Sequence, residues 1–372
     1  MIYLDYAANT PVDDSVLESF LETTKKYSGN PNSSHDCGLE ARREIDKVSE
    51  YIGNYFHTDH NNIIYTSGSS ESNNLVLKGI ALKKGNEGKR IIISAVEHSS
   101  IVAPCNYLAD MGYDVVVLPL DKNGLVDLEE LEKNINENTI LVSICSVDSE
   151  LGTIQPISEI SKIVRKYPNC VFHTDATQAI GKANIDYTRV DFITFAPHKF
   201  FGLNGFGVLV NVNNIKLVPL IHGGKSTTIY RSGTPVTANV VALGKAFELA
   251  TSKLDERINY LRDINSKLRE FFSKYNIHIN SPKGAIPTTL NVSVIDIKGK
   301  DMIDRLNDCG ICVSSTTACA LGNLPSKSVK AITGSDDLAS NTIRVSISHM
   351  TTLDEINKFM EIFDQIYKEL DE

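Results

Sequence analysis

The sequence predicts an α/β fold in which a mostly parallel sheet, covered by helices on both faces, is followed by a smaller α+β domain. Short β-branched runs alternate with helical patterns from residue 63 to residue 175. The runs IIYT, RIIIS and TILVSIC are apolar almost throughout, as expected for parallel strands that are buried on both faces. After residue 274 the order changes to strand, helix, short strand, loop, strand and final helix, which is typical of an α+β domain.

Each element follows from its own local pattern. Apolar runs predict strands at 63–66, 90–94, 114–119, 139–145 and 170–175, and one strand on each side of a polar break at 197–199. Helical periodicity predicts helices at 15–30, 38–56, 71–84, 99–111, 127–134 and 156–166. A single long helix at 238–274 is expected to connect the domains. Beyond it we expect strands at 288–295 and 342–347, helices at 299–309 and 352–369, and an irregular loop rich in Ser, Thr and Ala.

Length and composition place the chain among globular proteins with two domains. We expect a large domain at 15–250 and a small domain formed by 1–14 and 251–372. The net charge of −9 argues against direct binding of nucleic acid. The first residues, MIYLDYAANTPV, lack the basic region of a signal peptide, and no apolar run reaches the ~20 residues that span a bilayer. We therefore expect a cytoplasmic protein with no membrane partner.

Cysteine usage indicates reduced thiols. The chain has 7 cysteines, an odd number scattered over its length, which does not suggest a disulfide framework. Cys309 and Cys312 form a CxxC pair, for which a metal or redox role is the alternative to a structural one. Zinc would need two more ligands at a suitable spacing, so we favour structural cysteines and expect no metal.

Several polar residues stand where predicted strands end. Thr66-Ser67-Gly68-Ser69-Ser70 precedes a helix, and its small hydroxyls and backbone amides suit a phosphate; the alternative is a plain capped helix. His98 follows the next strand, either as a site residue or as a capping or core histidine. Asp175 ends a buried strand, where a carboxylate needs a proton-donating partner, and Gln178 follows closely.

Lys199 completes this set. It follows a buried strand, next to His198 and before a glycine-rich return. Apolar neighbours would lower the pKa of its amine toward that of a Schiff-base lysine, whereas a surface lysine in a hairpin loop is the alternative. A phosphate cradle, a ring-stacking histidine, a buried acid and a lysine are together what pyridoxal 5'-phosphate (PLP) requires. Their position at strand ends fits the rule for open α/β sheets.

The chain resembles the cysteine desulfurases of the NifS/IscS type, in the class V aminotransferase family, as a divergent member. The resemblance runs nearly end to end. It rests on YLDYAANTPV at 3–12, GNPNSSH at 29–35, YTSGSSESNN at 65–74, EHSSI at 97–101, NGLVDLEEL at 123–131, TILVSICSVDSELGTIQPI at 139–157, HTDATQAIGK at 173–182, HKFFG at 198–202, RSGTP at 231–235 and TIRVSIS at 342–348. It implies a PLP-dependent transferase of fold type I, with a seven-stranded sheet and a homodimer whose active site lies at the subunit interface.

The resemblance also implies a role for each site residue. Lys199 would form the Schiff base with PLP, and His98 would stack on the ring and shuttle protons. Asp175 would pair with the pyridine nitrogen and Gln178 with the ring hydroxyl. The phosphate would be held by Ser69, Ser70 and His198, and by Thr234 from the neighbouring subunit. Arg344 would bind the carboxylate of the substrate, L-cysteine.

Cys319 is the residue that selects the reaction. It stands in VSSTTACALGNLP, a loop of small residues in the small domain, where a thiol suits a mobile nucleophile better than a core cysteine. In the family, the matching cysteine takes the sulfur from the bound substrate as a persulfide, leaving alanine. The sulfur is then passed to an acceptor protein, for iron–sulfur assembly or thiolation.

Four departures from the family pattern mark a divergent branch. Asp148-Ser149 replaces Asn-Asn, and Ser149 is a shorter candidate for a cofactor contact. Ala196-Pro197 replaces Ser-Gly and removes a phosphate-binding hydroxyl, residues 225–229 lose an arginine, and Ser348-His349 replaces Gly-Arg. These changes suggest a particular acceptor or an altered substrate preference.

The sequence therefore predicts a PLP-dependent L-cysteine desulfurase with Cys319, Lys199 and His98 as catalytic residues. One alternative is a selenocysteine lyase or a PLP-dependent β-lyase. A further alternative is a sulfur-relay or scaffold protein without turnover.

Overall fold

A seven-stranded sheet forms the centre of the larger part of the protein, in the order β2-β8-β7-β6-β5-β3-β4. The computed structural model describes residues 1–316 and 325–371. The strands are β2 (Ile63–Thr66), β3 (Arg90–Ser94), β4 (Asp114–Leu118), β5 (Thr139–Ser143), β6 (Val171–Asp175), β7 (Phe192–Phe195) and β8 (Gly207–Asn211). β8 is antiparallel to both of its neighbours, whereas the other neighbouring strands are parallel. The mostly parallel sheet predicted from the sequence is confirmed.

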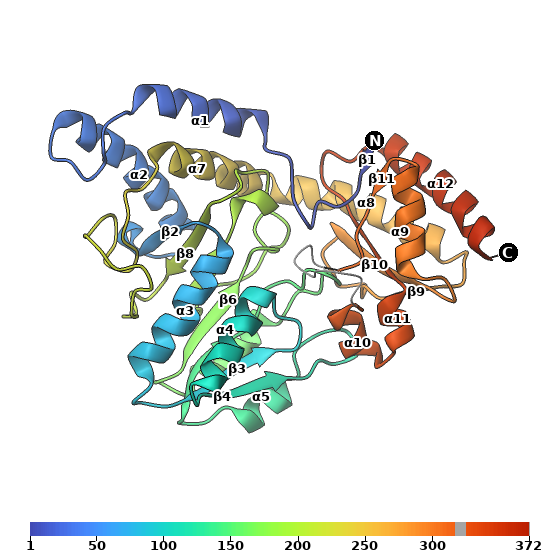
Figure 1. Cartoon of the computed structure of the whole chain (residues 1–372), viewed down its shortest axis with the longest axis horizontal. Helices are drawn as coiled ribbons and strands as arrows, with labels where there is room; N and C mark the ends of the chain where they lie inside the picture. The colour runs from blue at the N-terminus through green and yellow to red at the C-terminus, as the bar shows by residue number, and fades with distance from the viewer. Residues whose placement is uncertain (317–324, 372) are drawn as a thin grey trace.

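Helices cover both faces of this sheet, because the strands are apolar on both sides (Figure 1). On one face, Ile92, Val142 and Phe172 belong to a core shared with four helices. These are α2 (Asp36–Tyr55), α5 (Leu128–Asn134), α6 (Ile157–Val164) and α7 (Thr237–Ser252). On the other face, Ile91 and Leu141 pack with α3 (Ser69–Lys84) and α4 (Ser99–Asp110). α1 (Asp14–Lys26) lies against α7.

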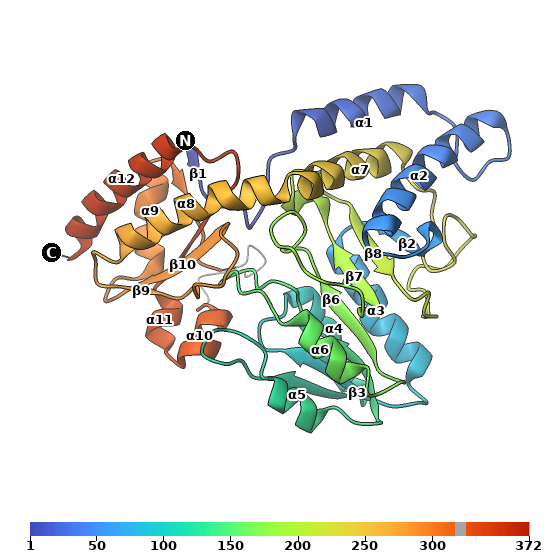
Figure 2. The same cartoon turned by 180° about the vertical axis from the view of Figure 1, so that it is seen from behind.

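The smaller part of the protein lies beside the larger one (Figure 2), and it has a hydrophobic core of its own. It contains a three-stranded antiparallel sheet in the order β12-β10-β9 and a parallel pair of β1 with β11. Its elements are β1 (Ile2–Tyr3), α8 (Leu254–Phe272), β9 (Ile277–Ile279), β10 (Thr289–Val294), α9 (Gly299–Asp308), β11 (Ile311–Cys312), α10 (Lys327–Thr333), α11 (Asp336–Ser340), β12 (Thr342–Ser346) and α12 (Leu353–Asp371). The N-terminal β1 therefore lies with the C-terminal elements, and the chain then crosses to α1. This arrangement supports the proposed domain division.

Several predicted element bounds were wrong. The single helix expected at 238–274 is two helices, because Lys253 leaves the helical conformation (φ −109°, ψ 15°) between α7 and α8. The helix expected at 15–30 ends at Lys26. The expected irregular loop contains α10 and α11, which are capped by Ser326 and Ser335 and are too short to produce a readable periodicity. Among the described residues, no helix combines the length and apolar character needed to cross a bilayer.

Candidate active site

A cavity of about 160 Å³ opens where the parallel strands reach their carboxyl ends. Its walls come from the ends of β6 and β7, from the first turns of α3 and α4, and from β12 of the smaller part. The residues predicted for the site that line this cavity are Ser69, Ser70, His98, Ser149, Asp175, Gln178, His198, Lys199 and Arg344. Ala7 and Ala8 of the N-terminal segment also line it, and sequence reasoning gave them no role. The fold thus brings together residues that are far apart in the chain.

The N-terminus of α3 forms the end of the cavity predicted to take a phosphate. Gly68 is the N-cap residue and supplies no side chain, so the amides of the first turn are not occupied by a side-chain cap. Glu71 turns away instead: its Oε2 accepts from the Ser67 backbone N–H at 2.7 Å, and its Oε1 pairs with Arg231 at 3.0 Å. The alternative of a plain helix capped by the side chain of Ser70 or its neighbour is therefore wrong. Open amides at the positive end of a helix dipole suit an anion.

Asp175 lies at the end of β6 and is only 7% exposed. Its Oδ2 accepts from Asn73 Nδ2 at 2.8 Å, and its Oδ1 accepts from the Thr177 backbone N–H at 2.9 Å. These two donors fix the orientation of the carboxylate. Asn73 belongs to α3 and also donates to Ser100 Oγ at 2.9 Å. Asn73 is four residues after Ser69, so the two residues lie on the same face of the helix. This spacing was the signal in the sequence that could have identified Asn73.

His98 combines both roles that the sequence left open. It is the N-cap residue of α4, with Nδ1 accepting from the Ser100 backbone N–H at 3.2 Å, and it also lines the cavity. Burial lowers the pKa of His98, and the charge of Lys199 lowers it further, although Asp175 opposes this. The lowered pKa favours the neutral imidazole, and the bond from the Ser100 backbone N–H favours the tautomer that carries its proton on Nε2.

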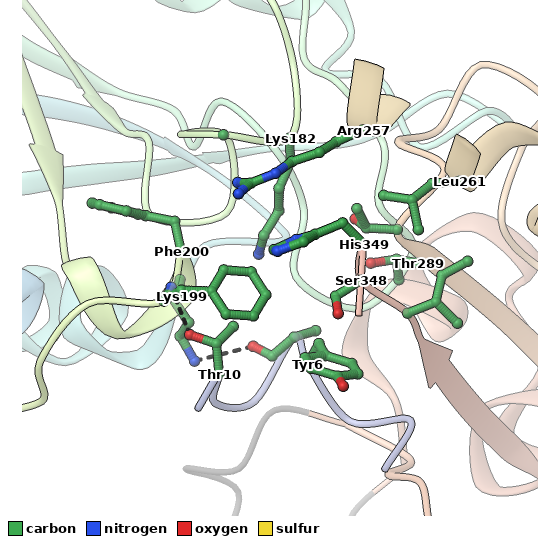
Figure 3. Close-up of a pocket in the computed structure, with 15 residues that line it drawn as sticks. Tyr6, Thr10, Lys182, Lys199, Phe200, Arg257, Leu261, Thr289, Ser348 and His349 are labelled. Carbon is green, nitrogen blue, oxygen red and sulfur yellow. Dashed lines mark hydrogen bonds between the residues drawn. The ribbon is translucent and has the colours of Figure 1, made fainter. Parts of the chain in front are cut away.

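Lys199 ends the short helix η2 (Pro197–Lys199), which follows β7. Its Nζ donates to the carbonyl oxygens of Ala7, at 3.0 Å, and Ala8. Gln178 Nε2 donates to the same Ala7 oxygen at 2.9 Å. The N-terminal segment thus contacts both the lysine and the glutamine of the predicted PLP site, as Figure 3 shows for Lys199.

Lys182 is a second amine close to this group. Its Nζ donates to Gln178 Oε1 at 2.6 Å, and it lines a smaller cavity of about 30 Å³ together with Lys199, Arg257 and His349 (Figure 3). Burial lowers the pKa of Lys182 to about 7, helped by the positive charges of Lys199 and Arg344. This amine can therefore be neutral near physiological pH. The sequence offered only its place in the segment 173–182 as a signal.

Arg344 of β12 faces the large cavity from the opposite side and is 1% exposed. Its Nη2 forms an ion pair with Asp5 Oδ1 at 2.9 Å, and its Nη1 donates to the Ser149 carbonyl oxygen at 3.0 Å. Its Nε has no partner among the described residues. The shortened Ser149 thus contacts Arg344 through its backbone.

Asp148 has a structural position next to this arginine. Its Oδ1 accepts from the backbone N–H groups of Glu150 and Leu151, and its Oδ2 accepts from Ser328 at 3.0 Å. Burial raises the pKa of Asp148, and burial together with Asp148 raises the pKa of Glu150 to about 7. Glu150 accepts from Ser326, so both acids join the large sheet to the start of α10.

Some predicted residues are not part of this cavity. Cys319 lies outside the described residues. Thr234 is exposed and lines no part of the cavity, so its contact with a neighbouring subunit stays a prediction. Cys309 is exposed and Cys312 is partly buried, and no cluster of three or more metal-ligating side chains occurs in the described part of the chain.

The residues that are present fit PLP. The cradle at α3 offers unoccupied amides to a phosphate, Asp175 offers a held carboxylate to a ring nitrogen, and Lys199 offers an amine. Thr177 Oγ1, which is buried beside Asp175, has no hydrogen-bond partner in the described structure and can serve a ring substituent. Such a buried polar atom without a partner is unusual unless a ligand supplies one.

Comparisons with known proteins show the family of the chain. The aminotransferase class-V family model matches residues 2–359. The cysteine desulfurase IscS of Dictyoglomus turgidum is 36% identical, with 99% of this chain and 95% of the relative covered. A solved NifS-like protein is 33% identical with a TM-score of 0.94, covering 99% of this chain and 100% of its own. A structure described as SspA in complex with cysteine is 32% identical with a TM-score of 0.81, covering 93% and 99%.

Fold and site thus define a class-V aminotransferase, the family to which the chain belongs. Within it, the identities over nearly the full length place the chain among the cysteine desulfurases of the NifS/IscS type. The family, the fold class and the class of enzyme predicted from the sequence are confirmed.

Proposed function

We propose that this protein is a PLP-dependent enzyme that removes sulfur from L-cysteine and leaves L-alanine. One observation carries the proposal: an amine, a held carboxylate, a phosphate cradle and a buried arginine all line one cavity. The cysteine-bound structure of a relative supports L-cysteine as the substrate. When bound through Lys199, PLP supplies an electron sink that acidifies the substrate α-carbon.

The residues of the large sheet would hold the cofactor. Asp175 would accept the N–H of the pyridinium ring, and the amide of Gln178 would donate to the ring hydroxyl. His98 would lie against the ring, with its Nε2 proton directed into the cavity. The phosphate would be held by Ser69, Ser70 and His198, and by Thr234 of a second copy in a homodimer.

The remaining residues would handle the substrate. Arg344 would bind its carboxylate, and the Lys199 amine would accept the α-proton. The Cys319 thiolate would attack the substrate sulfur, so that an S–S bond forms as the substrate C–S bond breaks. The bonding electrons would return to the substrate carbon, which takes up a proton to give alanine. Cys319 would then hold a persulfide.

The persulfide sulfur would pass to an acceptor protein, for iron–sulfur assembly or thiolation, in the cytoplasm. We infer this destination from the family and not from a surface of the structure. The identity of the acceptor is a separate question from the chemistry. The chemistry can be tested in one assay.

The test is to incubate the purified protein with PLP and L-cysteine, to quantify alanine, and to locate persulfide by mass spectrometry. We expect equimolar alanine and sulfide in the presence of a reductant, and persulfide on Cys319 when the reductant is left out. In the Cys319→Ala variant both should be lost, while PLP absorbance remains. Pyruvate as the main product would contradict the proposal and favour a β-lyase. A preference for selenocysteine would favour a selenocysteine lyase, and failure to bind PLP would favour a relay or scaffold protein.

A further inference from the structure

The segment after β1 contacts both cationic side chains of the site. Ala7 and Ala8 offer their carbonyl oxygens to Lys199, and Asp5 offers its carboxylate to Arg344. Asp5 and Arg344 are 339 positions apart in the chain, so this contact exists only in the folded protein. An ion pair in this position can orient the guanidinium or can compete with an incoming carboxylate.

Asp5 itself is firmly held. Its Oδ2 accepts from Ser314 Oγ at 2.7 Å, and its backbone forms a parallel bridge to Ser346 of β12. In the residue before it, Leu4 N–H donates to the Cys312 carbonyl at 2.9 Å, and the Leu4 carbonyl accepts from Ser346 N–H at 2.8 Å. Because backbone and side chain are both fixed, Asp5 cannot follow a displaced guanidinium. It therefore sets the plane in which Arg344 lies.

The hydrogen bonds of the guanidinium leave room for a second anion. An arginine has five N–H donors, and Arg344 uses one on Nη2 for Asp5 and one on Nη1 for Ser149. Its Nε is buried and has no partner among the described residues. Arg344 also lines the large cavity, so the remaining donors can meet a carboxylate there. Two different acceptors on its two Nη atoms prevent rotation of the group.

We propose that Asp5 is a positioning residue for carboxylate recognition: it holds Arg344 so that the unused N–H donors face the substrate carboxylate. The inference rests on the proposed function, in which Arg344 binds that carboxylate. A planar guanidinium binds a carboxylate through paired bonds only when its plane is correct, so orientation affects affinity directly. The negative charge of Asp5 also keeps the buried cation compensated while the cavity lacks substrate.

The rival role for Asp5 makes the opposite prediction. If Asp5 occupied the donors that the substrate needs, its removal would strengthen binding of a carboxylate. If Asp5 positions Arg344, its removal weakens binding. The sign of the change therefore decides between the two roles.

The test uses Asp5→Asn, which keeps the side-chain shape but removes the charge. Two thiol probes are compared by calorimetry on holoenzyme reduced with borohydride, in which the amine of a probe cannot displace Lys199 from the cofactor: 3-mercaptopropionate, which has the carboxylate, and cysteamine, which lacks it. We expect 3-mercaptopropionate to bind about tenfold more weakly and cysteamine to change less than twofold. The KM for L-cysteine should rise about tenfold, with kcat within threefold. Unchanged or tighter binding of 3-mercaptopropionate, or equal loss for both probes, would overturn the proposal.

Controls separate positioning from loss of folding. Asp114→Asn removes the charge of another aspartate paired with an arginine, Arg90, at the start of β4, and should leave both probes unaffected. Ser314→Ala keeps the ion pair but removes the hydrogen bond to Asp5 Oδ2. It should therefore weaken the binding of 3-mercaptopropionate about threefold and leave the binding of cysteamine unchanged. If Asp5→Asn does not fold, the Ser314→Ala variant tests the proposal instead. An equal loss of affinity for both probes in that variant would contradict the proposal.

The outcomes also distinguish this inference from the proposed function. If Arg344→Lys binds 3-mercaptopropionate as the wild type does, Arg344 is not the carboxylate site and the proposed substrate contact is wrong. If Arg344→Lys weakens the probe but Asp5→Asn does not, only the inference about Asp5 is wrong. Neither measurement depends on turnover.

Discussion

The two walls of the cavity are built on different principles. One wall is made of side chains at strand ends and helix starts: Asp175 at the end of β6, His98 before α4 and Lys199 after β7. The other wall is the N-terminal segment, which contributes two backbone carbonyls and the carboxylate of Asp5. The first wall carries the groups that we propose for the chemistry. The second holds the two cations in place.

The two cations also receive different acceptors from the second wall. Lys199 receives carbonyl oxygens, which orient an amine without adding a negative charge. Arg344 receives a carboxylate, which compensates a group that must stay charged. A lysine that binds a cofactor has to lose its proton, whereas an arginine that binds a carboxylate does not. The difference in acceptors matches the difference in task.

Asp175→Asn should break the strand-end wall and have the largest effect. The amide would bring no negative charge to a ring nitrogen, and it would face the amide of Asn73 with a donor where an acceptor is needed. We expect alanine formation to fall at least 100-fold, equivalent to about 3 kcal/mol, with PLP retention after dialysis reduced. Asp186→Asn is the matched control, because the exposed Asp186 accepts only from Thr188 in its own turn. Activity within tenfold of the wild type would contradict the role of Asp175.

The strand-end wall could be predicted from the sequence, because parallel strands bring their carboxyl ends to one edge. Asp175, His98 and Lys199 each follow an apolar run, so their shared location follows from the fold class. The capping role of His98 and the uncapped start of α3 could not be separated from plain helix signals. They depend on the local backbone conformation at Gly68 and Ser100.

Lys182→Met tests a charge placed between the two walls. A lysine has a pKa near 10.4 when unfolded, and burial lowers that of Lys182 to about 7. Between these values the unfolded chain binds more protons, so the free energy of unfolding of the wild type rises with pH across this window. The cost of the buried ammonium is therefore fully present below pH 7. The variant lacks this cost and should be more stable by roughly 2 kcal/mol at pH 6, with a gap that shrinks toward pH 10.

Urea unfolding of the apoprotein at pH 6 and pH 9 measures this gap. Lys166→Met is the control, since Lys166 is exposed and paired with Glu132. The difference in free energy of unfolding between this variant and the wild type should be the same at both pH values. A stability advantage of Lys182→Met that stayed the same from pH 6 to pH 9 would show that the amine stays charged in the folded protein.

The second wall could not be predicted in this way. YLDYAANTPV was recognised as a family segment, but nothing local connects Asp5 with Arg344 or Ala7 with Lys199. Backbone carbonyls have no sequence signature at all, and the small-domain position of β1 depends on its pairing with β11. Contacts of this kind become visible only when the folded chain is known.

Gly207→Ala should weaken the phosphate end of the strand-end wall. A Cβ on Gly207 would lie 2.3 Å from the carbonyl carbon of Gly68, so the N-terminus of α3 would have to move. We expect PLP to bind about tenfold more weakly, a loss of about 1.4 kcal/mol, as measured by fluorescence titration of the apoprotein. Gly284→Ala is the control, because no atom of the described residues lies within 4 Å of its added Cβ. Equal PLP affinities in the two variants would show that the cradle tolerates displacement.

Ser346→Ala should disturb the second wall with the smallest effect. Ser346 Oγ accepts from the buried Ala7 N–H at 2.9 Å. The carbonyl oxygen of Ala7 in turn accepts from Lys199 and Gln178 and orients both side chains. Loss of this bond should lower the free energy of unfolding by about 1 kcal/mol and reduce kcat two- to threefold. Ser49→Ala is the matched control, since Ser49 is a buried serine bonded to Ile45 and Tyr65 in the large core, away from the cavity. Both variants should lose similar stability, but only Ser346→Ala should change kcat. If Ser346→Ala also keeps the wild-type kcat, the second wall stabilises the fold and does not affect the function of Lys199.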